Sequence, residues 1–210
     1  MNTKRARQPA KVSRRQLLDA AEKLMITEGY AAVTTRRVGA DVGLSAPLVH
    51  YYYPTTEDLL VAAHRRAASR HKESILLALK SKRPLHALWK LMTRTRHMAL
   101  GLEFAALANH RKKICNEIAE HDVLIRQLQE QKLSQTMASQ EAERMGLSSL
   151  GAVMLIEGVA RALAIDKNFG LSLGHKDARE FIAGLLDAIE PTQAADTDSR
   201  LLQNGERTEI

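Results

Sequence analysis

Cys115 and His110 are the first residues whose types and spacing could do chemistry. A cysteine thiolate activated by a nearby histidine is a nucleophile, but such a pair needs a third orienting group and a loop that stabilises an oxyanion. Neither is recognisable in the sequence. A lone cysteine on a helix is more often a small packing residue. We therefore expect no catalytic residues and no enzyme activity.

His110, Glu117 and His121 form a second candidate group, this time for a metal ion. Imidazole and carboxylate groups are metal ligands, and positions i, i+7 and i+11 can share one face of a helix. They span about three helical turns, however, which is too far for one ion unless other helices contribute. Solvated polar faces are much more common. We expect no metal and no cofactor.

A third group has the chemistry of DNA contact. The guanidinium groups of Arg36 and Arg37 could reach phosphates or a guanine edge, and Tyr51 could donate to a phosphate. Ala46 and Leu48 are apolar and would contact thymine methyl groups or fit the shape of a groove. The candidate DNA-binding residues are Thr35, Arg36, Arg37, Ser45, Ala46, Leu48, His50 and Tyr51.

Two short helices and a tight turn must position these residues. Thr34 or Thr35 can cap the first helix, and Val38 faces inward. Gly43 ends this helix, because glycine adopts a positive φ without a steric penalty, and Ser45 caps the next helix only two residues later. Two helices joined by a turn of about 3–4 residues are typical of a helix-turn-helix.

A proline ends the second short helix, and a threonine begins the longer helix that follows it. Pro54 ends the second short helix near Tyr53, because the residue before a proline is disfavoured in the α region. Another helix begins near Thr56 and runs to about Leu79. It ends before the breaker sequence SKRP at 81–84.

This stretch resembles the DNA-binding region of tetracycline-repressor-type (TetR family) transcriptional regulators. The matching residues are Thr34, Val38-Gly39, Gly43-Leu44-Ser45, Tyr51 to Tyr53 and Glu57 to Leu60. The chain departs from the family pattern at two usual phosphate-contact positions: His50 stands where the family often has Tyr, and Thr56 where it often has Lys. The resemblance implies an all-α homodimer that binds double-stranded DNA at a palindromic operator.

The charge distribution agrees with a DNA-binding N-terminal half. The chain has a net charge of +7 and a pI near 9.7. Residues 1–100 contain 19 Lys and Arg against 7 Asp and Glu, whereas residues 101–210 contain 12 against 17. A net charge of +12 is thus followed by one of −5. This asymmetry favours a nucleic-acid partner for the first half and a different role for the second.

Composition predicts a soluble cytoplasmic protein without a membrane segment. The chain of 210 residues is 45% hydrophobic but has no apolar run long enough to span a bilayer, and its single cysteine fits a reducing compartment. We expect a disordered basic arm at 1–12, a DNA-binding domain at 13–55, a helical effector-binding and dimerisation domain at 56–190, and a disordered tail at 191–210. Only helical patterns follow residue 84, and the longest of them runs from about Arg111 to Met145.

The last two predicted helices, 148–170 and 175–189, combine small residues with large apolar ones. Small residues allow close approach of helices, and the resemblance implies that these helices pair with their symmetry mates. An intrachain core is the alternative. The candidate interface residues are Gly151, Leu155, Gly158, Ala162, Phe181, Leu185 and Ile189.

The resemblance also implies a pocket for a small effector whose binding moves the helix that begins near Thr56. Bulky apolar residues of the second half could line it, although ordinary core is an equally good interpretation of each. The candidates are Trp89, Met92, Phe104, Met137 and Met154. We therefore predict a repressor released from DNA by an unknown, largely apolar small molecule. The alternatives are a regulator controlled by a partner protein and, more distantly, a helical enzyme.

Overall fold

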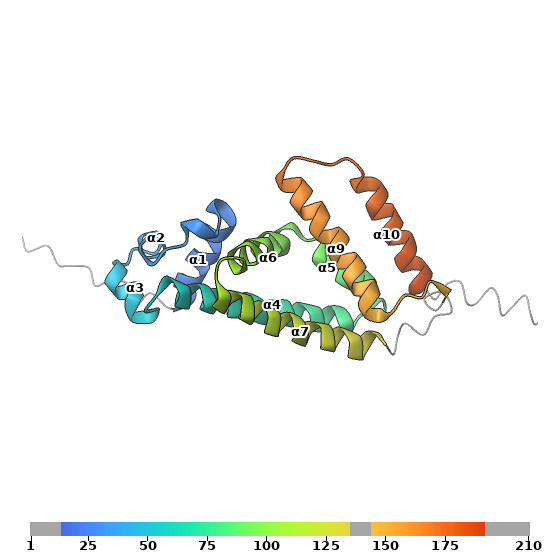
Figure 1. Cartoon of the computed structure of the whole chain (residues 1–210), viewed down its shortest axis with the longest axis horizontal. Coiled ribbons are helices and arrows are strands. Elements are labelled where there is room, and N and C mark those ends of the chain that lie inside the picture. Colours follow the sequence, from blue (N-terminus) through green and yellow to red (C-terminus); the bar gives the residue numbers. More distant parts are fainter. Residues whose placement is uncertain (1–13, 135–143, 192–210) are drawn as a thin grey trace, which may run out of the picture. The chain divides into compact units, whose positions relative to one another are not determined.

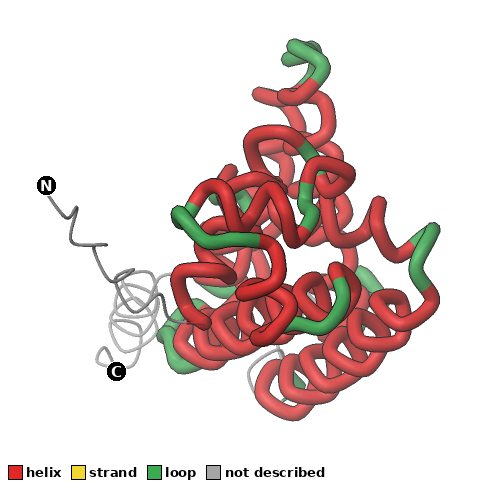
Figure 2. Tube along the Cα trace, turned by 90° about the vertical axis from the view of Figure 1, so that its left-hand side faces the viewer, coloured by secondary structure: helices red, strands yellow, loops and turns green. Residues whose placement is uncertain are grey.

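In a computed structural model of the chain, residues 14–134 and 144–191 are described, and every regular element among them is a helix (Figures 1 and 2). The elements are α1 (Arg14–Glu28), η1 (Tyr30–Ala32), α2 (Thr35–Asp41), α3 (Ala46–Tyr52), α4 (Thr56–Leu79), α5 (Pro84–Met92), α6 (Thr95–Ala108), α7 (Lys112–Leu133), α9 (Ser149–Asn168) and α10 (His175–Ile189). The all-α prediction is confirmed. The predicted N-terminal arm, and the predicted tail beyond residue 191, lie outside the described residues.

Most helix ends fall where the local signals place them. The helix that begins at Thr56 ends at Leu79, and the last helix runs from His175 to Ile189, as the sequence predicts. The Ser148 hydroxyl accepts a hydrogen bond from the Gly151 amide at 3.0 Å and caps α9. The predicted continuation of the long helix to Met145 runs through residues 135–143, which are not described.

The chain folds as two compact units, each of which is built from two separate stretches of sequence. The first contains residues 1–73 and 95–124, and the second contains residues 74–94 and 125–210. This division differs from the predicted boundary at residue 56. The N-terminal part of α4, all of α6 and the N-terminal part of α7 belong to the same unit as α1–α3.

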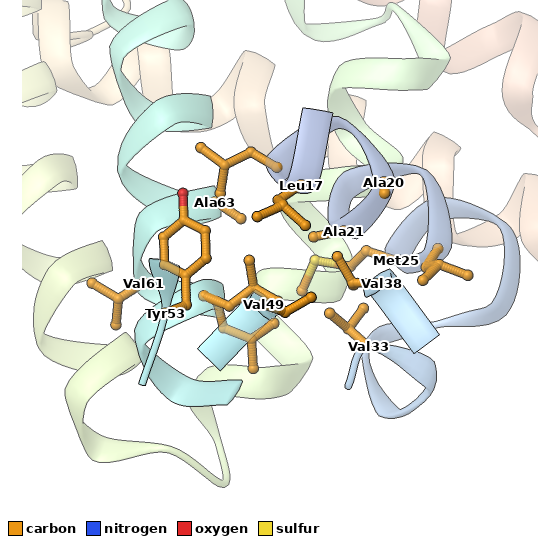
Figure 3. Packing of buried hydrophobic residues seen from close by; sticks show 14 of the residues in the cluster. Leu17, Ala20, Ala21, Met25, Val33, Val38, Val49, Tyr53, Val61 and Ala63 are labelled. Atoms are coloured by element: carbon orange, nitrogen blue, oxygen red, sulfur yellow. The ribbon is translucent and has the colours of Figure 1, made fainter. Parts of the chain in front are cut away.

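The core of the first unit explains this grouping. Leu17 of α1, Val38 of α2 and Val49 of α3 are fully buried, and Figure 3 shows Ala63 of α4 beside them. Phe104 of α6 joins the same cluster. Three short helices bury too little apolar surface to be stable alone, so α4 and α6 supply the remaining cover.

The core of the second unit lies among α5, α9 and α10. Leu88 of α5, Ile156 of α9 and Leu186 of α10 are almost completely buried and belong to one cluster. Just past the end of α10, the Glu190 carboxylate accepts hydrogen bonds from the Leu85 amide at 2.8 Å and the His86 amide at 3.2 Å. Glu190 therefore satisfies free amides at the start of α5 and joins α10 to it.

A carboxylate on α1 holds α4 in the first unit. The Glu22 side chain, 12% exposed, accepts a hydrogen bond from Arg66 Nε at 3.0 Å and from Arg70 Nη2 at 2.7 Å. Asp19 pairs with Arg66 as well, at 2.8 Å, but its side chain is 59% exposed. The largely buried carboxylate of Glu22 is thus the main polar link between α1 and α4.

The substitution Glu22→Ala should lower the free energy of unfolding by roughly 2–3 kcal/mol. This is less than the about 3–5 kcal/mol expected for a fully buried pair, because the Arg70 side chain is 45% exposed. Urea denaturation followed by circular dichroism measures the change. Asp19→Ala is the matched control and should cost less than about 1 kcal/mol. Equal losses for the two variants would contradict the role of burial.

Within residues 14–134 and 144–191, no helix is both long and apolar enough to cross a membrane.

Candidate functional site

The α2–turn–α3 segment has the geometry of a helix-turn-helix. Thr34, not Thr35, caps α2, since its hydroxyl accepts the Arg37 amide at 3.1 Å. Gly43 in the turn has a φ of +73°, as the prediction requires. Ser45 occupies the N-cap position of α3 but makes no side-chain capping bond there. Pro47 follows in the first turn of α3 and has no amide hydrogen to be capped.

Gly39 allows α2 and α3 to approach each other closely. A Cβ atom at this position would lie 2.8 Å from the Leu44 carbonyl oxygen and 2.9 Å from Cγ2 of Val49. The Leu44 amide in turn donates to the Gly39 carbonyl at 2.8 Å. The crossing of the two helices therefore depends on the absence of a side chain at residue 39.

A set of exposed side chains lies along this motif. Arg36 and Ser45 are exposed, Leu48 is 39% exposed and Tyr51 is 79% exposed. The Tyr51 ring meets the Tyr52 ring edge to face, with centroids 5.4 Å apart. A cation, a hydroxyl, an apolar side chain and a phenol are thus available to a partner that approaches α2 and α3. We call Arg36, Ser45, Leu48 and Tyr51 the reading surface.

Thr35 and His50, which we predicted to contact DNA directly, are engaged within the protein. Thr35 is 7% exposed, and its hydroxyl lies 3.3 Å from His50 Nε2. Because the Pro54 carbonyl, 2.9 Å from His50 Nδ1, can only accept, Nδ1 carries the proton and donates. Both ring nitrogens of His50 are therefore used. This pair links the start of α2 to the turn after α3. The burial of Thr35 contradicts its predicted direct contact with DNA, whereas His50 is exposed and its contact stays a prediction.

Arg37 has a partner of its own. Its Nη2 lies 2.8 Å and 2.7 Å from the two carboxylate oxygens of Glu28. Both side chains are about half exposed, so the pair contributes little to stability and costs little to break. Arg37 can reach a phosphate only by leaving Glu28. Ala46 is half-buried at the start of α3.

The predicted effector-pocket residues are distributed over both units. Phe104 is buried in the core of the first unit, whereas Met92 is buried in the core of the second and Trp89 packs against that core. Met154 is 55% exposed, and Met137 lies outside the described residues. Because α6 packs with α1, Phe104 is in a different cluster from Met92, and a pocket shared by these residues stays a prediction.

A surface groove between α4 and α7 lies in the first unit instead. Its volume is about 340 Å³. We call it the α4–α7 groove. It is lined by His64, Arg65, Ala68, Ser69, Lys72, Glu117, Glu120, His121 and Leu124. Leu124 is 39% exposed and lines this groove.

The candidate metal ligands are separated in the structure. His110 precedes α7, which begins at Lys112, so it does not share a helical face with the others. Glu117 binds Arg65, and this hydrogen bond lowers the pKa of the Glu117 carboxyl. His121 Nε2 lies 3.1 Å from His71 Nδ1. In the part of the chain that is described, no cluster of three or more His, Cys, Asp or Glu residues could hold a metal ion.

An apolar face remains exposed on α9 and α10. Leu155, Gly158 and Ala162 on α9 are exposed, and Phe181 on α10 is 67% exposed. A Cβ atom at Gly158 would meet nothing within 4 Å. We call Leu155, Gly158, Ala162 and Phe181 the α9–α10 face.

Three of the predicted interface residues have other roles. Ile189 is 3% exposed and packs in the core of its own unit. Leu185 is half-buried against the same core. A Cβ atom at Gly151 would lie 3.1 Å from Ser148 Oγ, so this glycine leaves room for the cap of α9. Ile189 is therefore not available to a partner, whereas the interface roles of Gly151 and Leu185 stay predictions.

The structure defines a class of protein in which a helix-turn-helix precedes further helices. The sequence profile of the family described as bacterial regulatory proteins, tetR family, matches residues 17–63. Residues 17–63, which contain the helix-turn-helix, are therefore similar to proteins of the tetR family, and this match covers less than a quarter of the chain. The relatives described below are likewise transcriptional regulators, in agreement with the expectation that the chain is not an enzyme.

Particular relatives support the same assignment. The HTH-type transcriptional regulator BetI of Rhizobium meliloti (strain 1021) is 31% identical over 70 residues, which cover 33% of this chain and 34% of that protein. The alignment thus spans about a third of this curated relative.

Two solved structures resemble the fold over most of the chain. A protein of Rhodococcus sp. described as a TetR-family transcriptional regulator matches with a TM-score of 0.66 at 18% identity, covering 84% of this chain and 98% of that one. A protein of Saccharomonospora viridis described as a transcriptional regulator, crystallised with choline, matches with a TM-score of 0.64 at 19% identity, covering 81% and 95%.

Proposed function

We propose that this protein is a homodimeric, sequence-specific DNA-binding transcriptional regulator, acting as a repressor that a small molecule releases from a palindromic operator. The observation that carries the proposal is the reading surface, which is exposed on two helices held in close contact at Gly39. A rigid pair of helices with exposed polar, basic and apolar side chains suits insertion into a major groove.

Each residue of the reading surface has a distinct proposed role. Arg36 follows the first residue of α2 and can bind a phosphate or a guanine edge. Leu48 can contact a thymine methyl group, and Ser45 can donate to a phosphate near the start of α3. Tyr51 donates its hydroxyl to a phosphate. Thr35 and His50 act indirectly, because their hydrogen bond helps to set how α3 is held against α2.

The exposed α9–α10 face supports the proposed homodimer. An exposed Phe181 and a small-residue surface around Gly158 are costly to leave in water and suit close packing against an identical pair of helices. Two-fold symmetry would present two reading surfaces to half-sites roughly 34–36 Å apart. This arrangement explains why we propose a palindromic operator.

A small effector is supported by the S. viridis relative, whose structure contains choline. Choline is therefore a reasonable first ligand to test here. The alternative is control by a partner protein. A thermal-shift screen against metabolites, with choline included, separates the two, because a ligand that binds only the folded state raises the melting temperature.

The DNA-binding role can be tested with the substitutions Arg36→Ala and Tyr51→Ala. We expect each to weaken binding to an operator, selected in vitro from random DNA, by roughly 1–3 kcal/mol, because each removes one contact while the core is unchanged. The change is measured by fluorescence anisotropy at several salt concentrations. Lys90→Ala, an exposed site on α5, is the control. Parental affinity for both reading-surface variants would refute the assignment.

The release mechanism can be tested by thermodynamic linkage. If an effector lowers operator affinity, a saturating operator must lower effector affinity by the same factor, typically about 5–150-fold for a coupling of about 1–3 kcal/mol. Calorimetric titration of the effector with and without operator measures this factor. Identical effector affinities in the two titrations would mean that the ligand does not control DNA binding.

A further inference from the structure

The α4–α7 groove has an acidic end. Arg65 donates two hydrogen bonds to the Glu117 carboxylate, Nε at 2.8 Å and Nη2 at 2.6 Å, so these two charges neutralise each other. The pKa of Arg65 is raised first by this hydrogen bond, and the nearby charge of Glu120 adds to the effect. Glu120 has no hydrogen bond or ion pair within the described residues. One negative charge is therefore left over at this end of the groove.

The opposite end is basic. Lys72 lines the groove together with His121. Burial lowers the pKa of His121, and the positive charge of Lys72 adds to this effect, whereas Asp122 opposes it. Lys72 itself has no hydrogen-bonding or ion-pairing partner in the described part of the chain. Arg65 and Lys72 are seven residues apart on α4, which corresponds to roughly 10 Å along the helix axis. Lys72 therefore lies about two helical turns beyond the Arg65–Glu117 ion pair.

His64 also lines the groove and is unusually buried for a polar side chain. It is 7% exposed, its ring meets the Phe104 ring edge to face at 5.1 Å, and its Nδ1 atom has no hydrogen-bond partner. A buried nitrogen without a partner costs free energy, so proteins rarely keep one without a reason. Burial lowers the pKa of His64 and keeps the ring neutral near pH 7.

We propose that the α4–α7 groove binds a small zwitterion, with its ammonium group at Glu120, its carboxylate at Lys72 and a hydrogen bond to His64. Unpaired charges of opposite sign at separate ends match the two charges of such a ligand. Ala68 and Leu124 provide apolar contacts for the segment between them. The volume of about 340 Å³ is at the small end of ligand sites, which run from about 300 to 1,000 Å³.

The position of the groove on α4 connects it with DNA binding. Leu59 and Ala63, which directly precede the groove residues of α4, are buried in the same cluster as Val49 of α3. A ligand that draws α4 and α7 together would therefore act on the support of the reading surface. That the zwitterion is the effector rests on the proposed function, whereas the existence of the binding site does not.

Calorimetric titration with linear ω-amino acids tests the ligand class and its length. The probes are glycine, 4-aminobutanoate, 6-aminohexanoate and 8-aminooctanoate, with hexanoate and hexylamine as singly charged controls and EDTA present throughout. We expect 6-aminohexanoate to bind at least about tenfold more tightly than glycine, hexanoate or hexylamine, because it alone can satisfy both charges at this separation.

Variants then locate the binding site. Lys72→Met and Glu120→Gln should each weaken 6-aminohexanoate binding by about tenfold or more, and Lys72→Met should leave the weak binding of hexylamine unchanged. His64→Phe keeps an aromatic ring against Phe104 and removes both nitrogens, so it should weaken binding while preserving the fold. Lys112→Met, an exposed lysine at the start of α7, is the matched control and should bind like the parent.

Each outcome has a definite meaning. Absence of binding by every ω-amino acid, or equal binding by the Lys72, Glu120 and control variants, would overturn the proposal. Binding of Zn²⁺ in place of the zwitterion, in titrations without EDTA, would overturn it as well. Zwitterion binding without any loss of operator affinity would refute only the effector role. Failure of the ligand-free protein to bind any selected DNA would refute the proposed function and leave the groove assignment intact.

Discussion

Gly39→Ala should disrupt the reading surface although it adds only one methyl group. The new Cβ would be 2.8 Å from the Leu44 carbonyl oxygen, a backbone atom that cannot move without shifting the turn. Overpacking of this kind costs about 1–3 kcal/mol of folding free energy. Displacement of α3 should also lower operator affinity by at least roughly tenfold, because a good base contact is itself worth about 1–3 kcal/mol.

Gly101→Ala is the matched control for this prediction. Gly101 lies within α6, and a Cβ atom there would meet nothing within 4 Å. Alanine is favoured over glycine inside a helix by about 1 kcal/mol, so this variant should be slightly more stable than the parent. Alanine is also favoured over glycine at position 39, because Gly39 lies within a helix. A net loss of folding free energy in Gly39→Ala therefore measures the steric conflict. A Gly39→Ala variant as stable as Gly101→Ala, with parental DNA affinity, would contradict the close approach.

Gly158→Arg should convert the proposed dimer into a monomer. The site is open in the single chain, so the fold should tolerate the substitution. In a closely packed pair of helices, however, a guanidinium group would be desolvated without a partner, which is strongly unfavourable. Loss of the second reading surface should weaken operator binding by roughly 10²–10⁴-fold, the usual contribution of linking two binding modules.

Sedimentation velocity measures the oligomeric state, and circular dichroism checks that the variant is folded. Gly101→Arg is the control, since it places the same charged side chain at an open glycine on α6, outside the α9–α10 face. We expect it to remain dimeric. If Gly158→Arg sediments as the parent does, the α9–α10 face is not the dimer interface.

Helix boundaries and the helix-turn-helix could be predicted from the sequence because their causes are local. The Thr34 cap, the positive φ at Gly43 and the break at Pro54 each depend on a few neighbouring residues. The exposed positions Arg36 and Tyr51 could be named in advance for the same reason, since the spacing of Val38 and Val49 fixes the buried face of each short helix.

The tertiary structure alone decided which helices share a core and which polar groups meet. Periodicity marks an apolar stripe on a helix but does not say which neighbour covers it, or whether an apolar residue such as Leu124 stays exposed. Phe104 was assigned to a pocket but packs with α1–α4, and His50 was assigned to DNA but binds Thr35, fifteen residues away. The α4–α7 groove brings together residues about fifty positions apart, such as Arg65 and Glu117. Such contacts depend on how distant segments pack, and short-range signals carry no information about that packing.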